Sequence, residues 1–136
     1  MKTTSAIVAW QPHKIADCVA AFLQSGDLEG IVSMFHPDCQ IFFPPDQPPS
    51  IGHEGARRVF ADFVAQRPVL KSTVTSEVII GDTALLHATW SFWGQDGSLI
   101  AEGASTEVAR RQKDGGWVYL IDCPLGAPAL PGRTGL

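Results

Sequence analysis

Apolar residues follow a helical period in the first part of the chain. They recur at the spacing of one helix face, at Ile15, Cys18, Val19, Phe22 and Leu23. Pro12 suits the first turn of a helix, because its missing N–H would have no intrahelical partner there. The pattern predicts an amphipathic helix over about residues 12–25.

A sharp corner is expected after this helix. Gly26 can adopt a left-handed backbone without a Cβ clash, and the carboxylate of Asp27 can cap the helix that follows. The apolar stripe then restarts at Leu28, Ile31, Val32 and Phe35, and Pro37 stops it. We therefore expect a second helix over about residues 27–36. Because the two helices share a buried side, they should bend around an interior.

The next segment combines one short strand with a third helix. Gln40–Phe43 reads as a strand, and the prolines between residues 44 and 49 predict an extended loop after it. A helix is expected over about residues 54–66, ending before Pro68. Its apolar side consists of Ala56, Val59, Phe60, Phe63 and Val64.

After Pro68 the pattern changes from helix to strand. Four runs are separated by glycine-containing turns, at Val69–Ile80, Thr83–Trp93, Ser98–Arg111 and Trp117–Cys123. In the second run one face is apolar (Leu86, Ala88, Trp90 and Phe92) and the other is mixed (Leu85, His87, Thr89, Ser91 and Trp93). This is typical of a sheet with a core side and a partner-facing side. Together the elements predict an α+β fold with helices on one face of an antiparallel sheet.

The composition is that of an ordinary globular domain. With 136 residues, of which 45% are hydrophobic, the chain should form one domain with one core. A net charge of −4 and the lack of a basic run argue against nucleic acid as a partner. The apolar run at residues 6–10 is too short for a signal peptide or a membrane span, so we expect no membrane association and a cytoplasmic location. Residues 1–10 and 125–136 are expected to be loosely ordered.

We expect no metal and no cofactor. Cys18, Cys39 and Cys123 form no C-x-x-C pair, and no metal-ligand spacing joins them to the four histidines. The sequence also contains no glycine-rich loop of the kind that holds phosphates.

Three segments carry a resemblance to a known family. They read VAAFLQSGDLEGIVSMFHPDC at 19–39, IGHEGARRVFADF at 51–63 and DGGWVYLIDCPLG at 114–126. Together they resemble the nuclear transport factor 2-like superfamily, in its SnoaL-like and ketosteroid-isomerase-like branch, over about residues 12–126. The resemblance implies a cystatin-like cone, in which three N-terminal helices pack in a curved antiparallel sheet and enclose an apolar pocket. It also implies a homodimer formed through the outer face of the sheet.

The same resemblance argues against one reaction. A steroid isomerase of this fold uses a carboxylate base, a tyrosine and a neutral carboxylic acid. Aligned through the Gly26-Asp27 corner, the base position falls on Phe43 and the tyrosine position on Val19, while the acid falls near Glu107. Because two of these three groups are replaced by apolar residues, we expect no steroid isomerase activity by that mechanism.

Two carboxylates on the later strands are catalytic candidates. Asp122 could point into the cone and act as a base, or it could cap the turn before Pro124. Glu107 alternates with Ser105 and Ala109, so it is a buried acid or base if that face is inward. We favour the outward orientation for Glu107, as one half of a cross-strand ion pair.

The histidines offer one further candidate. His53 is expected at the start of the third helix, where the helix dipole disfavours its charged form and leaves it free to act as a base. We expect His36 and His53 to flank the pocket mouth, and His87 to lie on the outer face. A structural role at a helix end remains open for both His36 and His53.

The sequence therefore predicts a pocket for a small apolar or cyclic molecule. Its walls are expected to include Val19, Phe43, Phe60, Phe63, Trp90 and Phe92. If the protein is an enzyme, the expected chemistry is proton transfer of the isomerase, cyclase or dehydratase type, by Asp122 with Glu107 or His53. The alternative is a non-catalytic ligand-binding or dimerisation module.

Overall fold

A computed structural model describes residues 7–130 of the chain. The helices are η1 (Pro12–Lys14), α1 (Ile15–Ser25), α2 (Leu28–Val32) and α3 (Gly52–Gln66). The strands are β1 (Phe35–Ile41), β2 (Ser50–Ile51), β3 (Val69–Ile80), β4 (Thr83–Trp93), β5 (Leu99–Arg111) and β6 (Trp117–Cys123). They form a single sheet in the order β2-β1-β6-β5-β4-β3, antiparallel except between β1 and β6.

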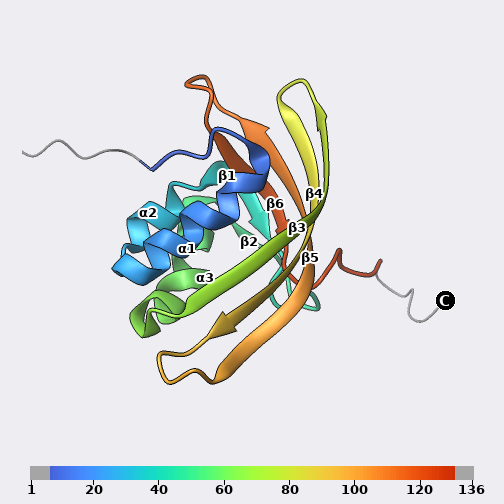
Figure 1. Ribbon diagram of the computed structural model, residues 1–136. Coiled ribbons are helices and arrows are strands. Elements are labelled where there is room, and N and C mark those ends of the chain that lie inside the picture. Colours follow the sequence, from blue (N-terminus) through green and yellow to red (C-terminus); the bar gives the residue numbers. More distant parts are fainter. Residues whose placement is uncertain (1–6, 131–136) are drawn as a thin grey trace, which may run out of the picture.

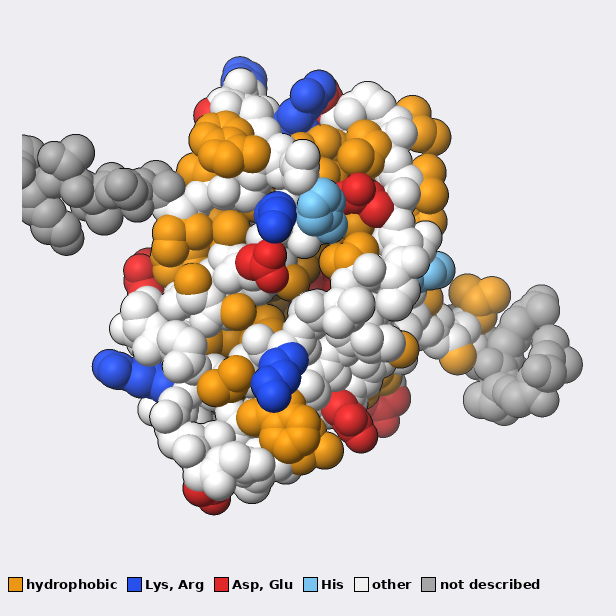
Figure 2. Space-filling model, in the orientation of Figure 1, with side chains coloured by type: hydrophobic (Ala, Val, Ile, Leu, Met, Phe, Trp, Pro, Cys, Tyr) orange, Lys and Arg blue, Asp and Glu red, His pale blue; other side chains and the backbone are white. Residues whose placement is uncertain are grey.

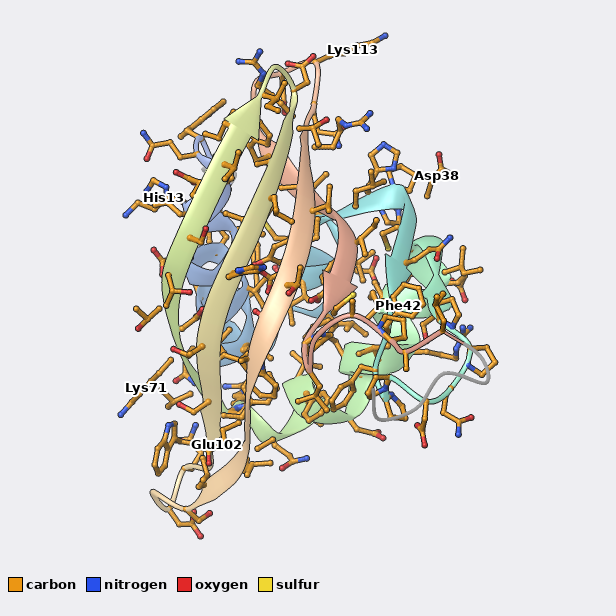
Figure 3. All side chains as sticks on the ribbon, turned by 90° about the vertical axis from the view of Figure 1, so that its right-hand side faces the viewer. His13, Asp38, Phe42, Lys71, Glu102 and Lys113 are labelled. Atoms are coloured by element: carbon orange, nitrogen blue, oxygen red, sulfur yellow. The ribbon has the colours of Figure 1, made fainter. Side chains whose placement is uncertain are left out.

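The sheet curves around the helices, as the sequence predicted. Figure 1 shows the helices gathered on its concave side, with β3 to β6 bending past them. Figure 3 looks onto the opposite, outer face, from which Lys71 and Glu102 project. The alternation along β4 is confirmed, because Leu86 and Phe92 are buried while His87 is exposed. The fold is therefore α+β with its core between the helices and the concave face.

The corner between α1 and α2 has the predicted chemistry. Gly26 ends α1 in the left-handed region at φ 70°, which a residue with a Cβ adopts less readily. Asp27 caps α2, since its Oδ1 accepts a hydrogen bond from the backbone N–H of Gly30 at 2.9 Å. This corner sets the angle at which the two helices meet over the sheet.

The second helix and first strand were predicted with wrong boundaries. The helix ends at Val32 rather than near residue 36, and the strand starts at Phe35 rather than at Gln40. The cause is a long-range contact, because β1 runs beside β6 with Phe35 opposite Tyr119. Pro37 is tolerated because it lies within a register shift of this ladder, between Phe35 and Gln40.

The start of the described chain is packed rather than loose. Ala9 is buried, and its carbonyl accepts a hydrogen bond from the N–H of Trp117 at 2.8 Å. This corrects the expectation for the end of the 1–10 segment. Residues 1–6 and 131–136, on which the rest of that expectation and part of the one for 125–136 fall, lie outside the described residues.

Replacing Gly30 with alanine should destabilise the protein, although alanine favours helix formation by about 1 kcal/mol. A Cβ at this position would lie 2.2 Å from Cδ1 of Phe22, whose ring is buried in the core and has little room to move. We expect Gly30→Ala to lower the free energy of unfolding by roughly 1–3 kcal/mol, measured by urea denaturation.

The control for this prediction shortens the side chain that the new Cβ would meet, by replacing Phe22 with leucine. Combined with Phe22→Leu, Gly30→Ala should cost less than the sum of the two single substitutions. If Gly30→Ala is neutral or stabilising by itself, the close packing between α1 and α2 at this point is wrong.

Candidate functional site

An apolar cavity, called the chamber below, lies between the helices and the concave face of the sheet. All six side chains predicted as ligand contacts line it, namely Val19, Phe43, Phe60, Phe63, Trp90 and Phe92. The rings contact one another, with centroids of Phe63 and Phe92 5.1 Å apart and those of Trp90 and Phe92 5.4 Å apart. The cavity volume is about 90 Å³, against on the order of 10–15 Å³ needed for one water by this measure. The chamber can therefore hold a small ring.

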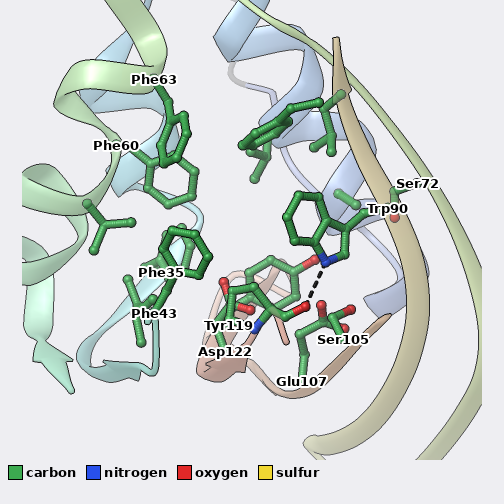
Figure 4. Close-up of a pocket in the computed structure, with 17 residues that line it drawn as sticks. Phe35, Phe43, Phe60, Phe63, Ser72, Trp90, Ser105, Glu107, Tyr119 and Asp122 are labelled. Carbon is green, nitrogen blue, oxygen red and sulfur yellow. Dashed lines mark hydrogen bonds between the residues drawn. The ribbon is translucent and has the colours of Figure 1, made fainter. Parts of the chain in front are cut away.

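Two carboxyl groups point into this chamber from neighbouring strands (Figure 4). Glu107 on β5 pairs directly with Asp122 on β6, and their exposed fractions are 7% and 8%. The outward orientation expected for Glu107 was wrong. Its partner on the other side, Leu86 of β4, faces the core, and cross-strand partners lie on the same face of a sheet.

A β-bulge brings a tyrosine to the same place. Tyr119 pairs with Ala109 and Asp122 pairs with Glu107, so β6 contains one more residue than β5 between the two pairs. The extra residue is Leu120, and a bulge of this kind shifts the alternation by one. Tyr119 and Asp122 therefore both line the chamber, although a regular strand would point them to opposite faces.

Tyr119 is the candidate site residue that the sequence analysis missed. It is the only tyrosine of the chain and is almost completely buried. Two signals were present in the sequence. A tyrosine in a buried strand needs a partner for its hydroxyl, and Tyr119 lies three residues before the candidate Asp122. Neither signal could reveal the bulge on which its orientation depends.

Burial and mutual repulsion shift the pKa values of this cluster upward. Desolvation is the main cause for Asp122, whose pKa lies well above its ordinary value, and the charge of Glu107 raises it further. Desolvation also raises the pKa of Glu107 to about 7, although a hydrogen bond from Ser105 acts in the opposite direction. The pKa of Tyr119 is raised by burial and then by the two carboxylates. In both carboxyl groups, burial therefore favours the protonated form.

A tryptophan closes the side of the chamber next to Asp122. The indole N–H of Trp90 donates a hydrogen bond to the carbonyl oxygen of Pro124 at 2.7 Å, as Figure 4 shows. A Cβ on Gly103 would lie 2.6 Å from Leu125 and 3.1 Å from the Pro124 oxygen, so glycine lets the segment after β6 cross β5 closely. This contact ties the residues that follow Asp122 to the wall of the chamber.

The histidines lie outside the chamber. The Nε2 atom of His53 is 2.8 Å from the carbonyl oxygen of Phe35, and His53 is not among the side chains that line the chamber. The Nδ1 atom of His36 accepts a hydrogen bond from the N–H of Asp38, and His87 is exposed on β4. The structure thus brings Asp122 and Glu107 together and leaves His53 apart.

Within residues 7–130, no three His, Cys, Asp or Glu side chains meet in a group that could hold a metal ion. The three cysteines are buried and form no disulfide, and burial raises the pKa of each thiol. Across the same stretch, no helix is both long and apolar enough to cross a bilayer. The chemistry that this arrangement can perform is proton transfer between a carboxyl pair, a phenol and a ligand.

Comparison with known sequences identifies one family. The family model of the SnoaL-like domain matches residues 15–120, which includes most of the chamber wall and the strand that carries Glu107. Among curated proteins, none matches the chain.

Solved structures from several bacteria share the fold. A Thiobacillus denitrificans protein described as a calcium/calmodulin-dependent protein kinase type II association domain is 18% identical, with a TM-score of 0.68 over 88% of this chain and 98% of that one. A cystatin-like protein of unknown function from Nostoc punctiforme is 16% identical, with a TM-score of 0.63 over 87% and 90%. A Streptomyces avermitilis protein described as a dehydratase of the NTF2-like family is 22% identical, with a TM-score of 0.63 over 85% and 91%.

The contribution of Glu107 to the free energy of unfolding should fall as pH rises, because its pKa is higher in the folded chain than in the unfolded one. Its side chain binds a proton in the folded state up to about pH 7, whereas the unfolded chain releases it near pH 4.5. Relative to Glu107→Gln, the wild-type protein should therefore lose about 3 kcal/mol of unfolding free energy between pH 4 and pH 8. Urea denaturation at a series of pH values measures this difference.

Glu102→Gln is the matched control, because Glu102 lies on the same strand but is exposed. This substitution removes the same charge and should leave the pH dependence close to that of the wild type. Parallel curves for the wild type and Glu107→Gln would contradict the burial of an ionisable Glu107.

Proposed function

The chain belongs to the SnoaL-like domain family, and we propose that it is an enzyme that moves a proton on a small cyclic substrate whose ring is uncharged. The observation that carries this proposal is the buried pairing of Glu107 with Asp122 beside Tyr119 in one chamber. Ionisable groups are expensive to bury, and they persist in pockets where chemistry needs a shifted pKa. A protein that only bound an apolar ring would need none of them.

The shifted pKa values support a different role for each group. Glu107 ionises near neutral pH and serves as the base that removes a proton from a carbon next to a carbonyl. Asp122 keeps its proton and, with the hydroxyl of Tyr119, donates hydrogen bonds to the negative charge that develops on the carbonyl oxygen. Return of the proton from Glu107 to another carbon gives an isomerase. Transfer of the same proton to a hydroxyl on the adjacent carbon, which leaves as water while the C=C bond forms, gives a dehydratase.

The walls support an uncharged ring as the substrate. Among the residues that the structure describes, no Lys, Arg or His lines the chamber, so a carboxylate or phosphate would find no counter-charge there. Aromatic side chains supply flat contact surfaces on several sides. The dehydratase name of the Streptomyces avermitilis protein is consistent with this class of reaction.

The proposed arrangement differs from that of a steroid isomerase. Val19 and Phe43, at the positions where that enzyme carries its tyrosine and its base, form part of the chamber wall. The acid and the base would instead come from β5 and β6, on the opposite side of the chamber from α3. The proposed reaction therefore takes place at β5 and β6, the two middle strands of the sheet.

A bicyclic ketone tests the proposal without knowledge of the natural substrate. We expect the protein to accelerate deuterium uptake next to the carbonyl of 2-tetralone in D2O, followed by proton NMR. The rate should rise through about pH 7, as Glu107 becomes the carboxylate. Glu107→Gln should lower it about 100-fold, and Asp122→Asn should lower it about tenfold through the loss of a donor.

Asp62→Asn provides the control, because Asp62 is an exposed carboxylate on α3. It should exchange deuterium at the wild-type rate. If 2-tetralone binds but the wild type exchanges no faster than Glu107→Gln, the catalytic proposal fails and a ligand-binding module of the same fold takes its place.

We further propose that the protein is a homodimer formed through the outer face of the sheet. One apolar residue from each of four neighbouring strands lies in a row across this face, namely Val78, Leu85, Val108 and Ile121. Leu85 is 43% exposed and Val78 is 50% exposed, which is costly for a monomer in water. A second copy related by a twofold axis would cover both rows at once.

Leu85→Glu should convert the dimer to a monomer, because it places a charge at the centre of the apolar row. Sedimentation velocity measures the change, and circular dichroism checks that the fold is retained. Ala61→Glu, on the exposed side of α3, should stay dimeric. A wild-type protein that sediments as a monomer would refute the proposed interface.

A cytoplasmic location also remains part of the proposal. All three cysteines are buried without a disulfide, which is usual in a reducing compartment.

A further inference from the structure

A second, polar cavity lies beside the chamber. This cavity, called the cleft below, is a solvent-open depression between the start of α1 and the edge strand β3. Its polar side chains are His13, Asp17, Ser72, Thr75, Ser76 and Glu77. Figure 2 shows this side of the molecule, with a histidine, a basic and two acidic side chains close together on it. The proposed proton transfer uses none of these groups.

The cleft and the chamber meet at two small residues. Ala16 of α1 and Ser72 of β3 line both cavities. Ser72 pairs with Trp90 across the ladder, so it lies on the face of the sheet that forms the chamber wall. Because neither side chain is large, a ligand that reached past these two residues from the chamber would enter the cleft. The cleft is therefore the polar neighbour of the aromatic chamber.

The charges along this path are mostly negative. The Nδ1 atom and the backbone N–H of His13 both lie within 3.0 Å of one oxygen of Glu77, and Asp17 lies on the neighbouring turn. The Nζ atom of Lys14 lies 3.8 Å from Oδ2 of Asp17, and more than half of each side chain is exposed to water. Within the described residues, neither cavity is lined by a Lys or an Arg. An anionic group would therefore be disfavoured in the cleft, and a cation would be favoured.

The buried pair strengthens this preference. Glu107 and Asp122 are more than nine-tenths buried and point into the chamber, which adds negative charge at its inner end whenever the pair has lost a proton. The apolar walls of the chamber favour an uncharged ring, and the water-exposed carboxylates of the cleft favour a positive group there. The two cavities together describe one elongated binding site with an apolar end and an acidic end.

We propose that the substrate is a ring compound that carries a short arm ending in an ammonium group, with the ring in the chamber and the ammonium in the cleft beside Glu77 and Asp17. This inference rests on the proposed function in that it names the substrate class of the same site. Its test measures binding alone, so it does not depend on turnover. Ala16 and Ser72 are the residues that admit the arm.

Three probes with the same ring and nearly the same length separate charge from shape. They are 3-phenylpropylamine, 3-phenylpropan-1-ol and 3-phenylpropanoate, and calorimetric titration of the full-length protein at pH 7 gives their affinities. We expect the amine to bind about fivefold more tightly than the alcohol, as for an exposed ion pair. The carboxylate should bind more weakly than both, and added salt should reduce the advantage of the amine.

Two substitutions locate the arm. Glu77→Gln should remove the preference for the amine and leave the affinity for the alcohol unchanged, whereas Glu102→Gln, on the outer face of β5, should preserve the preference. Ser72→Leu narrows the space between the two cavities and should weaken the three arm-bearing probes more than toluene, which has no arm to place. Thr73→Leu, the exposed neighbour on β3, is its control.

Equal affinities of the amine and the alcohol for the wild-type protein would overturn the proposal, as would an amine preference that survives Glu77→Gln. Binding of none of the three probes would overturn it as well. A failure of deuterium exchange with the amine preference intact would refute only the catalytic assignment. If deuterium exchange occurs but the protein shows no preference for the amine, the catalytic proposal stands and the ammonium arm is excluded.

Discussion

The ladder between β5 and β6 holds Glu107 opposite Asp122 on the concave face of the sheet. Inside an apolar chamber the two carboxyl groups cannot both ionise without a large cost, because burial and mutual repulsion each disfavour charge. The aromatic walls that desolvate the pair are also part of the hydrophobic core. The same packing that stabilises the fold therefore destabilises the charged state of its central pair, and it shifts their pKa values towards neutrality.

This arrangement explains how an acid–base site can form where the steroid-isomerase positions are apolar. Val19 and Phe43 do not weaken the site but keep water away from β5 and β6, where Glu107 and Asp122 lie. The contact of Trp90 with the segment after β6 closes the wall beside Asp122. One side of the chamber supplies the apolar surroundings and the other supplies the ionisable groups, so the proposed chemistry depends on both.

Much of the fold could be predicted from local pattern. The bounds of β3, β4 and β6 agree with the sequence analysis, because alternation and glycine turns are local properties of each strand. The Gly26-Asp27 corner was predicted for the same reason. The start of β1 was not, because Phe35 continues a helical stripe in sequence and becomes a strand residue only through its pairing with β6. Local preference gave way there to a contact between residues far apart in the chain.

For the site, the sequence by itself determined which residues could do chemistry. It supplied two carboxylates on late strands, an aromatic wall, and apolar residues at the isomerase positions. Only the tertiary structure decided where those groups point. Glu107 faces inward because its neighbour Leu86 does, and the bulge at Leu120 turns Tyr119 to the side of Asp122. The direction of a strand side chain depends on its partner strands and on the register between them, and neither is encoded in the spacing of residues along one strand.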